Sequence, residues 1–600
     1  MYSTSNKTQL LDRRVILVSC IFFLTHFLFY GTALGQGFLR ADGQKIINRK
    51  GDNVLLRGIG LGGWMLQEGY MLKVNRDGQQ YRIRERIEEL IGKKQADEFY
   101  ESWLLNHTTK ADVDSMKAWG FNSIRLPMHY NLYTLPLEKE PVKGVNTWLA
   151  KGFAMTDSLL SWCKANQMYL ILDLHAAPGG QGNDLNISDR DPSKPSLWDS
   201  EANQQKTVAL WRKLAERYVS EQWIGGYDII NEPNWGFTDP EKDKNGTGEP
   251  TNGPLKKLMV DITRAIREVD KNHLIIIEGN GWGNNYRGIL PQWDNNMALS
   301  YHKYWNFNDL ESIKGFLEAR EKYNIPIWLG ETGENSNVWF TDAIRLLETN
   351  NIGWSWWPLK KVGINNPLEV KSNPNYDRVV NYWNGVGKKP GESDAYSGLM
   401  ELASALKIRN NVVHRDVIDA MIRQPFSTET KPFKKHLTGP GTIIQAVDYD
   451  LGRNGCAYFD KDTANYRVSG QDGRGNRGGA YRNDGVDIRR DSSGYEKYYV
   501  SDIEDGEWLQ YTIDVERAAC YTVHLNIKSP IDTGKFLLVV NGKSFVSNSP
   551  IPVTEDLKAS GFLEFRNIRL TKGANKVRVY VEKGGMDLTE LRFSGRAGRR

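Results

Sequence analysis

Cysteine is scarce in this chain, which has 4 cysteines among 600 residues. One of them, Cys20, lies in an apolar N-terminal segment. The other three, Cys163, Cys456 and Cys520, form no CxxC pair and no spacing typical of metal ligands, which argues against a structural zinc site. Cys456 and Cys520 lie in the same C-terminal region and would be able to pair in an oxidising compartment, but spacing alone leaves that pairing open.

An excess of charge of one sign is also missing. The chain has 78 basic and 73 acidic residues, a net charge of +5, and the basic residues form no stripe. Because nucleic-acid recognition needs clustered Lys and Arg, the composition argues against a nucleic-acid partner. The composition, with 40% hydrophobic and 25% charged residues, is typical of a globular protein. The length of 600 residues predicts two or more domains. We expect a monomer.

Long apolar runs are few, and the clear example is at the N-terminus. Residues 15–30 are apolar, follow Arg13 and Arg14, and precede the small residues Ala33 and Gly35. This order predicts a secretory signal peptide over residues 1–35 and a secreted protein, extracellular or periplasmic. The alternatives are lipidation at Cys20 and an uncleaved anchor. Most of the run follows Cys20 and the run is short for a membrane span, so neither is favoured.

Residues 36–422 alternate short apolar runs with amphipathic helical patterns. The eight runs occupy residues 54–63, 121–127, 168–175, 226–233, 273–280, 297–304, 325–333 and 352–360. Between them lie helical patterns such as residues 110–119, which a Thr109 and Asp112 capping box opens and Gly120 closes. Eight continuous apolar strands alternating with helices predict an α/β fold, a (β/α)₈ TIM barrel, with a doubly wound open sheet as the alternative.

Two further segments complete the predicted organisation. Residues 423–441 are rich in Pro, Thr, Gly and Lys without periodicity, which predicts a linker. Residues 442–595 contain short alternating runs at 506–515, 520–528, 535–543, 563–570 and 575–583. Frequent short strands with Gly and Asp turns predict an all-β sandwich (jelly-roll) domain.

Several of the eight apolar runs end in side chains that can do chemistry. These are Arg125, His175, Asn231 with Glu232, His302 with Tyr304, Glu331 and Trp357. In a (β/α)₈ barrel the carboxyl ends of the strands meet at one face, and the site is built there. The pattern therefore predicts that these side chains converge on one opening.

Two carboxyl groups across one opening are typical of a glycosidase, where one attacks the anomeric carbon and the other protonates the leaving oxygen. Arg125 and Tyr304 would stabilise an ionised Glu331, while Glu232 would keep its proton longer beside that charge. We therefore expect Glu331 as the nucleophile and Glu232 as the acid and later the base. Asn231 would bond the sugar 2-hydroxyl, and Trp357 would offer a face to the ring.

Each of these residues also has a structural interpretation. A glutamate after a strand is commonly a surface or capping residue, and the two histidines would be ordinary buried ones. Arg125 would pair with a core acid such as Asp173 or Asp228, and Trp357 would pack beside its neighbouring tryptophans. The joint placement of all of them at the same end of different runs favours the functional interpretation.

The motifs NEP on the fourth run and GET on the seventh, with IRLP, DLH and HKY, resemble glycoside hydrolase family 5 over residues 38–420. This resemblance implies a retaining (β/α)₈ enzyme with its acids on strands 4 and 7 and carboxyl groups about 5 to 5.5 Å apart. It implies Glu232 as acid/base and Glu331 as nucleophile. The supporting residues would be Arg125, His175, Asn231, His302, Tyr304 and Trp357. It implies no metal and no cofactor.

The loop at residues 175–186 is similar to that of family members that act on β-glucans, both cellulase-like and exo-β-1,3-glucanase-like ones. The sequence thus predicts an endo-acting, cellulase-like β-glucanase. The alternatives are an exo-β-1,3-glucanase, a mannanase or xylanase of the same fold, and a non-catalytic polysaccharide-binding protein. Four tryptophans near the rim would be sugar platforms or loop packing, namely Trp64, Trp235, Trp282 and Trp305.

Residues 442–595 resemble carbohydrate-binding module family 6 through AVDYD, GGAYRNDGVDI, DGEWLQYTIDV and GMDLTELRF. The resemblance implies a polysaccharide ligand. Tyr481 matches one stacking aromatic of that family, whereas Phe562 stands where tryptophan is usual and Asp587 where asparagine is usual. Gln445 and Val447 replace the glutamates that help to hold a structural calcium, so a calcium ion here is doubtful.

Overall fold

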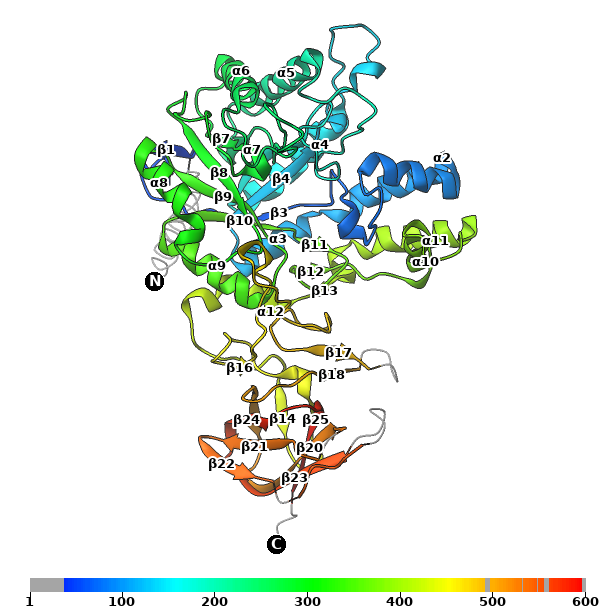
Figure 1. The fold of residues 1–600 in the computed structure, drawn as a ribbon, viewed down its shortest axis with the longest axis vertical. Helices are drawn as coiled ribbons and strands as arrows, with labels where there is room; N and C mark the ends of the chain where they lie inside the picture. Colours follow the sequence, from blue (N-terminus) through cyan, green and yellow to red (C-terminus); the bar gives the residue numbers. More distant parts are fainter. Residues whose placement is uncertain (1–36, 492–496, 531, 548, 555–560, 596–600) are drawn as a thin grey trace, which may run out of the picture.

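The computed structural model describes residues 37–491, 497–530, 532–547, 549–554 and 561–595. Figure 1 shows a large α/β domain and, below it, a smaller β domain that ends the chain. The predicted signal peptide, residues 1–35, lies outside the described residues. Among the described residues, no helix has both the length and the apolar character needed to cross a membrane.

Eight parallel strands close into a barrel, because β10 pairs with β3 as well as with β9. The strands are β3 (Arg57–Gly60), β4 (Ser123–His129), β5 (Tyr169–Ala176), β6 (Ile224–Asp228), β7 (Ile275–Glu278), β8 (Met297–Lys303), β9 (Ile327–Gly333) and β10 (Gly353–Trp357). Each overlaps one predicted apolar run. Closure excludes the open-sheet alternative and confirms the (β/α)₈ fold.

The barrel strands are apolar runs because both of their faces are covered. Every residue of β5 and β9 is buried. One face contacts the barrel interior and the other contacts the outer helices, so solvent-facing polar residues are not needed. The polar side chains are concentrated at the carboxyl ends of the barrel strands.

Helices cover the outside of the barrel (Figure 1). They are α3 (Lys110–Trp119), α4 (Ala150–Ala165), α5 (Glu201–Tyr218), α6 (Gly253–Val269), α8 (Lys314–Tyr323), α9 (Asn337–Thr349) and α12 (Arg415–Ile422). The Thr109 and Asp112 capping box and the left-handed Gly120 at the end of α3 are present as predicted.

Three further helices pack on one another beside the barrel: α2 (Gln80–His107), α10 (Pro374–Trp383) and α11 (Glu392–Ala405). Short elements connect these parts. They are β1 (Arg40–Asp42), β2 (Lys45–Ile47), the single-turn α7 (Asn280–Gly283), β11 (Lys360–Lys361), β12 (Leu368–Glu369) and β13 (Val412–Val413). The helical layer has its own apolar core, which includes Phe99 and Leu399.

The C-terminal domain consists of two six-stranded sheets. One holds β14 (His436–Thr438), β16 (Tyr458–Phe459), β19 (Trp508–Val515), β21 (Lys535–Val540), β22 (Lys543–Val546) and β24 (Gly573–Lys583). The other holds β15 (Ile443–Gln445), β17 (Ile488–Arg490), β18 (Tyr498–Val500), β20 (Ala519–Lys528), β23 (Gly561–Leu570) and β25 (Asp587–Gly595). Both sheets share one apolar core, which includes Leu525 and Val579, so the predicted β-sandwich is confirmed.

Two details differ from the sequence analysis. Residues 436–438, inside the predicted linker 423–441, form β14 and pair in parallel with β19, so part of that segment belongs to the sandwich. Three residues are too few to show periodicity. Cys456 and Cys520 are free thiols. Cys456 precedes β16 in one sheet and Cys520 is exposed on β20 in the other, so the suggested pairing is wrong.

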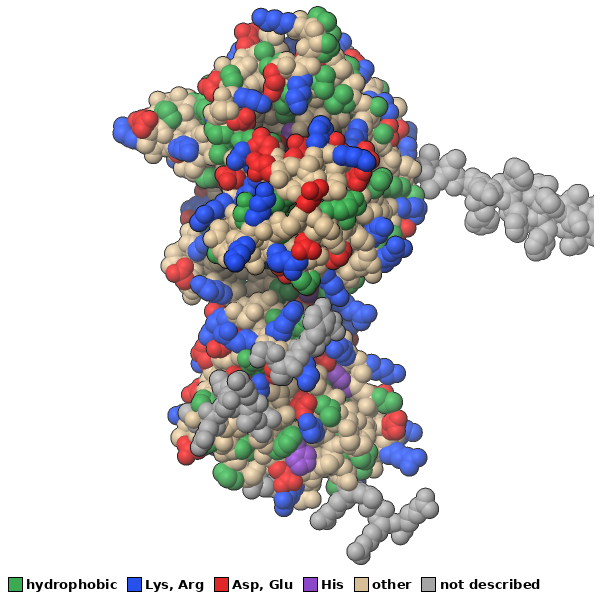
Figure 2. All heavy atoms as spheres, turned by 90° about the vertical axis from the view of Figure 1, so that its right-hand side faces the viewer, with side chains coloured by type: hydrophobic (Ala, Val, Ile, Leu, Met, Phe, Trp, Pro, Cys, Tyr) green, Lys and Arg blue, Asp and Glu red, His purple; other side chains and the backbone are tan. Residues whose placement is uncertain are grey.

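Figure 2 shows acidic and basic side chains interspersed over one face of both domains. This mixture agrees with the near balance of 78 basic and 73 acidic residues. A surface of this kind lacks the one-sided field that would steer a polyanion.

Candidate active site

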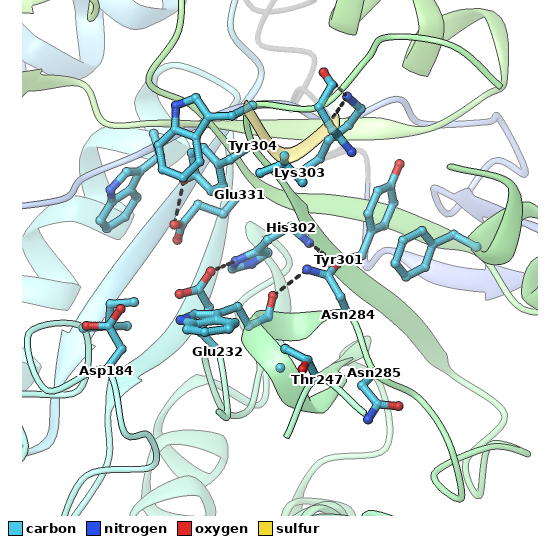
Figure 3. Close-up of a pocket in the computed structure, with 18 of the residues that line it drawn as sticks. Asp184, Glu232, Thr247, Asn284, Asn285, Tyr301, His302, Lys303, Tyr304 and Glu331 are labelled. Carbon is cyan, nitrogen blue, oxygen red and sulfur yellow. Dashed lines mark hydrogen bonds and ion pairs between the residues drawn. The ribbon is translucent and has the colours of Figure 1, made fainter. Parts of the chain in front are cut away.

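A cavity of about 1340 Å³ opens at the carboxyl ends of the barrel strands. Segments that follow β3, β5, β6, β7, β8 and β9 line it, together with Trp357 at the end of β10. Figure 3 shows side chains that follow β5, β6 and β7 or lie on and after β8 and on β9. Among the lining residues are Glu68, His175, Asp184, Glu232, Trp282, His302, Tyr304, Trp305, Glu331 and Trp357. This volume exceeds the roughly 300 to 1000 Å³ of a typical small-molecule pocket, and it has room for more than one sugar ring.

Glu232 and Glu331 point into the same space, with His302 beside them (Figure 3). One side-chain ligand atom from each of the three residues lies within 4.8 Å of the other two. Glu331 belongs to β9, whereas Glu232 follows β6 in a left-handed conformation with φ of 41°. Its backbone N–H donates to Glu278 Oε2 at 2.7 Å, which holds this unusual turn in place.

Both carboxylate oxygens of Glu331 accept a hydrogen bond. Arg125 Nη1 donates to Oε2 at 2.8 Å, and the Tyr304 hydroxyl donates to Oε1 at 2.8 Å. Burial and the charge of Glu331 raise the pKa of Tyr304 well above its ordinary value, so this hydroxyl remains a donor. A cation and a neutral donor therefore bond this carboxylate and hold it in the orientation that a nucleophile needs.

Glu232, in contrast, has the surroundings of a proton donor. Burial raises its pKa to about 7, against the charge of His302, and the charges of Glu331 and Glu278 raise it further. His302 Nδ1 lies 2.6 Å from Glu232 Oε1. Near neutral pH a large fraction of Glu232 is therefore protonated beside a carboxylate, which is the division of roles that acid catalysis needs.

Glu278, a third buried glutamate, organises the site and was missed by the sequence analysis. Its Oε1 lies 3.0 Å from Arg125 Nη2 and 3.2 Å from His302 Nε2. Burial opposes its charge, but His302 and Arg125 lower its pKa to about 2. Glu278 ends the fifth apolar run, residues 273–280, so the rule that selected the other strand ends would have found it.

Arg125 lies fully buried at the base of the site. Its guanidinium contacts four carboxyl groups, those of Asp173 at 3.2 Å, Asp228 at 2.9 Å, Glu278 at 3.0 Å and Glu331 at 2.8 Å. Burial raises the pKa of Asp228 well above its ordinary value, which reduces the negative charge around the guanidinium. One side chain thus bonds both the core acids and Glu331, and a role of Arg125 in catalysis stays a prediction.

Asn231, His175 and Trp357 form one connected group. Asn231 Oδ1 accepts from Arg125 Nη2 at 2.7 Å, and its Nδ2 lies 3.3 Å from His175 Nε2. The His175 ring stacks on Trp357 at 5.0 Å with 7° between the planes. Trp357 Nε1 donates to the Tyr70 hydroxyl at 2.8 Å. His175 and Trp357 line the cavity, whereas Asn231 is fully buried behind its wall.

The four rim tryptophans divide into two pairs. Trp282 and Trp305 line the cavity. Trp64 is buried and donates to the Leu104 carbonyl, and Trp235 packs under the Arg190 guanidinium at 4.8 Å. The first pair remains available as sugar platforms, whereas the second pair serves loop packing.

Three further acids line the cavity that the sequence analysis did not name, Glu68, Asp184 and Glu334. Burial raises the pKa of Glu68 and Asp184, and the charge of Glu331 adds to the effect on Glu68. Glu68 follows the first apolar run and Asp184 follows the third. The sequence analysis did not identify Glu68 and Asp184 because both lie in long glycine-containing loops. A loop residue cannot be assigned to one face of the barrel before the fold is known.

Glu232, His302 and Glu331 are also the one group of such side chains, in the described part of the chain, spaced to hold a metal ion. A cation among them would have to break the 2.6 Å contact of His302 with Glu232 and compete with Arg125 for Glu331. The group therefore fits acid–base chemistry better than metal binding.

The residues predicted for sugar binding in the C-terminal domain lie in separate surroundings. Tyr481 packs against Tyr498 at 4.8 Å, whereas Phe562 is 44% exposed on β23 with Arg592 4.9 Å from its ring. Asp587 begins β25, and burial followed by the charge of Asp502 raises its pKa to about 6. Sugar binding by this domain stays a prediction, as does calcium binding.

Comparison with known proteins gives the family. Residues 83–363 match the family described as "Cellulase (glycosyl hydrolase family 5)". Residues 83–363 are a glycosyl hydrolase family 5 domain. The protein is accordingly a glycosidase that acts on O-glycosyl bonds. The match begins within α2, so β3 completes the barrel from outside the matched segment.

Relatives of this chain, whose residues 83–363 form the family 5 domain, carry different names. "Beta-xylosidase" of Phanerodontia chrysosporium is 26% identical over 385 residues, which cover 57% of this chain and 74% of that protein. "Endoglucanase C" of Acetivibrio thermocellus is 25% identical, covering 42% and 84%. "Glucan 1,3-beta-glucosidase" of Candida oleophila is 26% identical, covering 43% and 59%. The names of these relatives all denote glycosidases, but they denote different substrates.

Solved structures that are similar include a rutinosidase from Aspergillus niger, with 18% identity and a TM-score of 0.40, covering 51% of this chain and 90% of that one. An endoglucanase from Thermotoga maritima has 19% identity and a TM-score of 0.34, covering 42% and 82%.

Proposed function

We propose that this family 5 protein is a retaining β-glycosidase that hydrolyses β-glucan by double displacement. The observation that carries the proposal is the approach of Glu232 and Glu331, whose oxygens lie within 4.8 Å. Retaining glycosidases hold their carboxyl groups about 5 to 5.5 Å apart, whereas inverting ones need about 6.5 to 9.5 Å to admit a water between acid and sugar.

In the first step Glu331 attacks the anomeric carbon and Glu232 donates its proton to the glycosidic oxygen. The carbon–oxygen bond breaks, the shortened chain leaves as an alcohol, and the sugar is esterified to Glu331. In the second step Glu232 takes a proton from water, the water oxygen attacks the anomeric carbon, and Glu331 leaves. Two inversions retain the anomeric configuration.

The other side chains support these two acids. Arg125 and Tyr304 orient Glu331 for attack through the 2.8 Å bonds described above. His302 orients Glu232 and, as a cation, limits the rise of its pKa. The bond from Asn231 to the sugar 2-hydroxyl is part of the proposal. Since Asn231 is held by Arg125, it would need to present its amide N–H through the cavity wall.

Our first candidate for the substrate is an internal bond of a β-glucan, as in a cellulase-like endo-β-glucanase. The family description and the relative named endoglucanase support this choice. The large cavity also supports it, because a polysaccharide must place sugars on both sides of the bond that is cut.

A second candidate, attack at a chain end, is favoured by the walls of the cavity. Segments after six barrel strands line it together with the end of β10, and so do Arg467 and Val468 of the C-terminal domain. A site walled on many sides suits a terminal sugar. The relatives named glucan 1,3-beta-glucosidase and beta-xylosidase support this candidate.

Hydrolysis of a polysaccharide panel tests the proposal. We expect turnover of β-1,3- or β-1,4-glucan, with the β-anomer as the first product in proton NMR spectra. Oligosaccharides of mixed length would indicate internal attack, and single sugars terminal attack. Preference for mannan or xylan would reject the glucan assignment. Binding without turnover would identify a non-catalytic polysaccharide-binding protein, and an α-anomer would reject retention.

The activity is expected to fall as the pH rises through about 7. Glu232 must carry its proton to protonate the leaving group, and its pKa is about 7. Above that value the carboxyl group is ionised and the first step slows, so kcat/KM falls up to tenfold per pH unit. A pH profile of kcat/KM from about pH 4 to 9 measures this limb. Undiminished activity at the upper end would contradict it.

We also propose that the protein is secreted as a monomer and that its β-sandwich holds it on polysaccharide. Secretion rests on the predicted signal peptide at residues 1–35. Retention on polysaccharide rests on the exposed Phe562 and on the resemblance of the domain to a carbohydrate-binding module. Mass determination of the mature chain checks the first, and pull-down on insoluble glucan checks the second.

A further inference from the structure

The β-sandwich is bonded to the segment that follows the β9 strand of Glu331. Asn483 Nδ2 donates to the Asn335 carbonyl at 2.8 Å, and Asn337 Nδ2 donates to Asp484 Oδ1 at 2.9 Å. All four of these residues are buried. Separating the two domains would leave these polar groups without their partners, so the contact is specific and holds the domains in one arrangement.

A loop of the sandwich reaches from this contact to the rim of the cavity. The Val468 N–H donates to the Trp305 carbonyl at 2.9 Å. The Phe307 N–H donates to Ser469 Oγ at 2.9 Å, and the rings of Phe307 and Tyr466 are 5.2 Å apart. The short helix η8 (Arg467–Ser469) is therefore fixed on the loop that follows β8.

Arg467 occupies a particular place in this arrangement. Its guanidinium lies 3.8 Å from the centroid of the Trp305 ring, and both residues line the cavity that holds Glu232 and Glu331. The indole Nε1 of Trp305 donates to the Glu334 carbonyl at 3.0 Å, which fixes the ring. In the described part of the chain, the guanidinium N–H groups of Arg467 have no carboxylate or carbonyl acceptor, although the side chain is held by stacking.

We propose that Arg467, stacked on Trp305, forms a distal sugar subsite that the C-terminal domain contributes to the catalytic cavity. The ligand is a β-glucan sugar some way from the bond that is cut. This inference rests on the proposed function. A guanidinium presents five N–H donors in one plane, and sugar hydroxyls and ring oxygens are acceptors. Its stacking on Trp305 means that little side-chain freedom remains to be lost on binding.

A neutral sugar fits this subsite better than an anionic ligand. The carboxyl groups of Glu68, Asp184 and Glu334 line the same cavity. The burial and the neighbouring carboxylates that raise the pKa of Glu68 would also disfavour a negatively charged substrate, whereas hydroxyl groups can bond both the acids and the guanidinium. Tyr304 connects the subsite to Glu331. Its ring lies 5.1 Å from that of Trp305, and its hydroxyl donates to Glu331. The contacts run from Arg467 through Trp305 and Tyr304 to Glu331, so we expect Arg467 to bind a sugar beyond the one that Glu331 attacks.

The test compares substrates of increasing length on the full chain. For Arg467→Ala we expect kcat/KM on β-gluco-oligosaccharides of four to six sugars to fall about tenfold, the size expected for a lost charged hydrogen bond. With an aryl β-glucoside that carries one sugar, kcat/KM should change by less than about twofold. Arg467→Lys, which keeps the charge but loses the planar fork, should fall between the wild type and Arg467→Ala.

Arg474→Ala is the matched control. Arg474 is an exposed arginine of the same domain, near Arg467 in sequence, and does not line the cavity. It should leave all substrates unaffected. An equal loss on long and short substrates in Arg467→Ala would show a structural role and overturn the subsite. No loss on any substrate would overturn it as well. A wild-type chain inactive on every β-glucan would instead reject the proposed function and the subsite with it.

Discussion

Replacing Glu331 by glutamine is expected to lower kcat on β-glucan by about 10⁴-fold or more. The amide is a poor nucleophile, and the covalent sugar ester cannot form. Binding should persist, because glutamine has the shape of glutamate: its one oxygen can accept from Arg125, and its NH2 group can donate to the Tyr304 hydroxyl. Initial-rate measurements on soluble glucan determine the loss, and calorimetry on an oligosaccharide determines binding.

The control for this substitution is Glu321→Gln on α8. Glu321 is exposed, so the same chemical change there should alter the rate by less than about twofold. A second readout identifies the nucleophile directly. A 2-deoxy-2-fluoro glycoside with a good leaving group should label the wild-type chain on the peptide that contains Glu331, as shown by mass spectrometry. Near wild-type hydrolysis by Glu331→Gln would contradict the role of Glu331 as the nucleophile.

Replacing Glu232 by glutamine is expected to lower kcat/KM on polysaccharide by about 10³-fold, within the range for the loss of a general acid. The leaving sugar is a poor leaving group and needs the proton. A dinitrophenyl glycoside does not need it, so its first step should be affected far less. The fall in activity above about pH 7 should also disappear, because the group with that pKa is gone.

The matched control for this second variant is Glu241→Gln. Glu241 lies in the insert that follows Glu232 and is exposed. Its replacement should leave both substrate classes and the pH profile unaffected. If Glu232→Gln lost the same factor on the dinitrophenyl glycoside as on polysaccharide, the side chain would not be the proton donor, and a role in binding or folding would explain the loss.

Several parts of the architecture were predictable from local patterns. The eight apolar runs became eight strands because a parallel barrel buries both faces of each strand, which leaves a continuous apolar sequence. The α3 helix began and ended where the Thr109 and Asp112 capping box and Gly120 predicted. The strand-end rule brought His175, Glu232, His302, Tyr304, Glu331 and Trp357 to one cavity.

Other parts were not predictable from those patterns. Glu68 lies in a loop, and its approach to Glu331 depends on how that loop folds over the rim. Cys456 and Cys520 belong to the same domain, but Cys456 lies in the turn before β16 and Cys520 lies on β20 of the other sheet, which the run lengths do not reveal. The strand β14 has three residues, and its pairing with β19 is visible only once the sandwich is formed.

The sequence by itself determined the barrel and the sandwich and predicted the two acids, because hydrophobic periodicity and strand-end residues are local properties of the chain. The tertiary structure decided the approach of Glu232 to Glu331, the burial that raises the pKa of Glu232 to about 7, and the placement of Arg467 on Trp305. Distances, desolvation and contacts between domains depend on residues far apart in sequence, and only the closed fold brings these together.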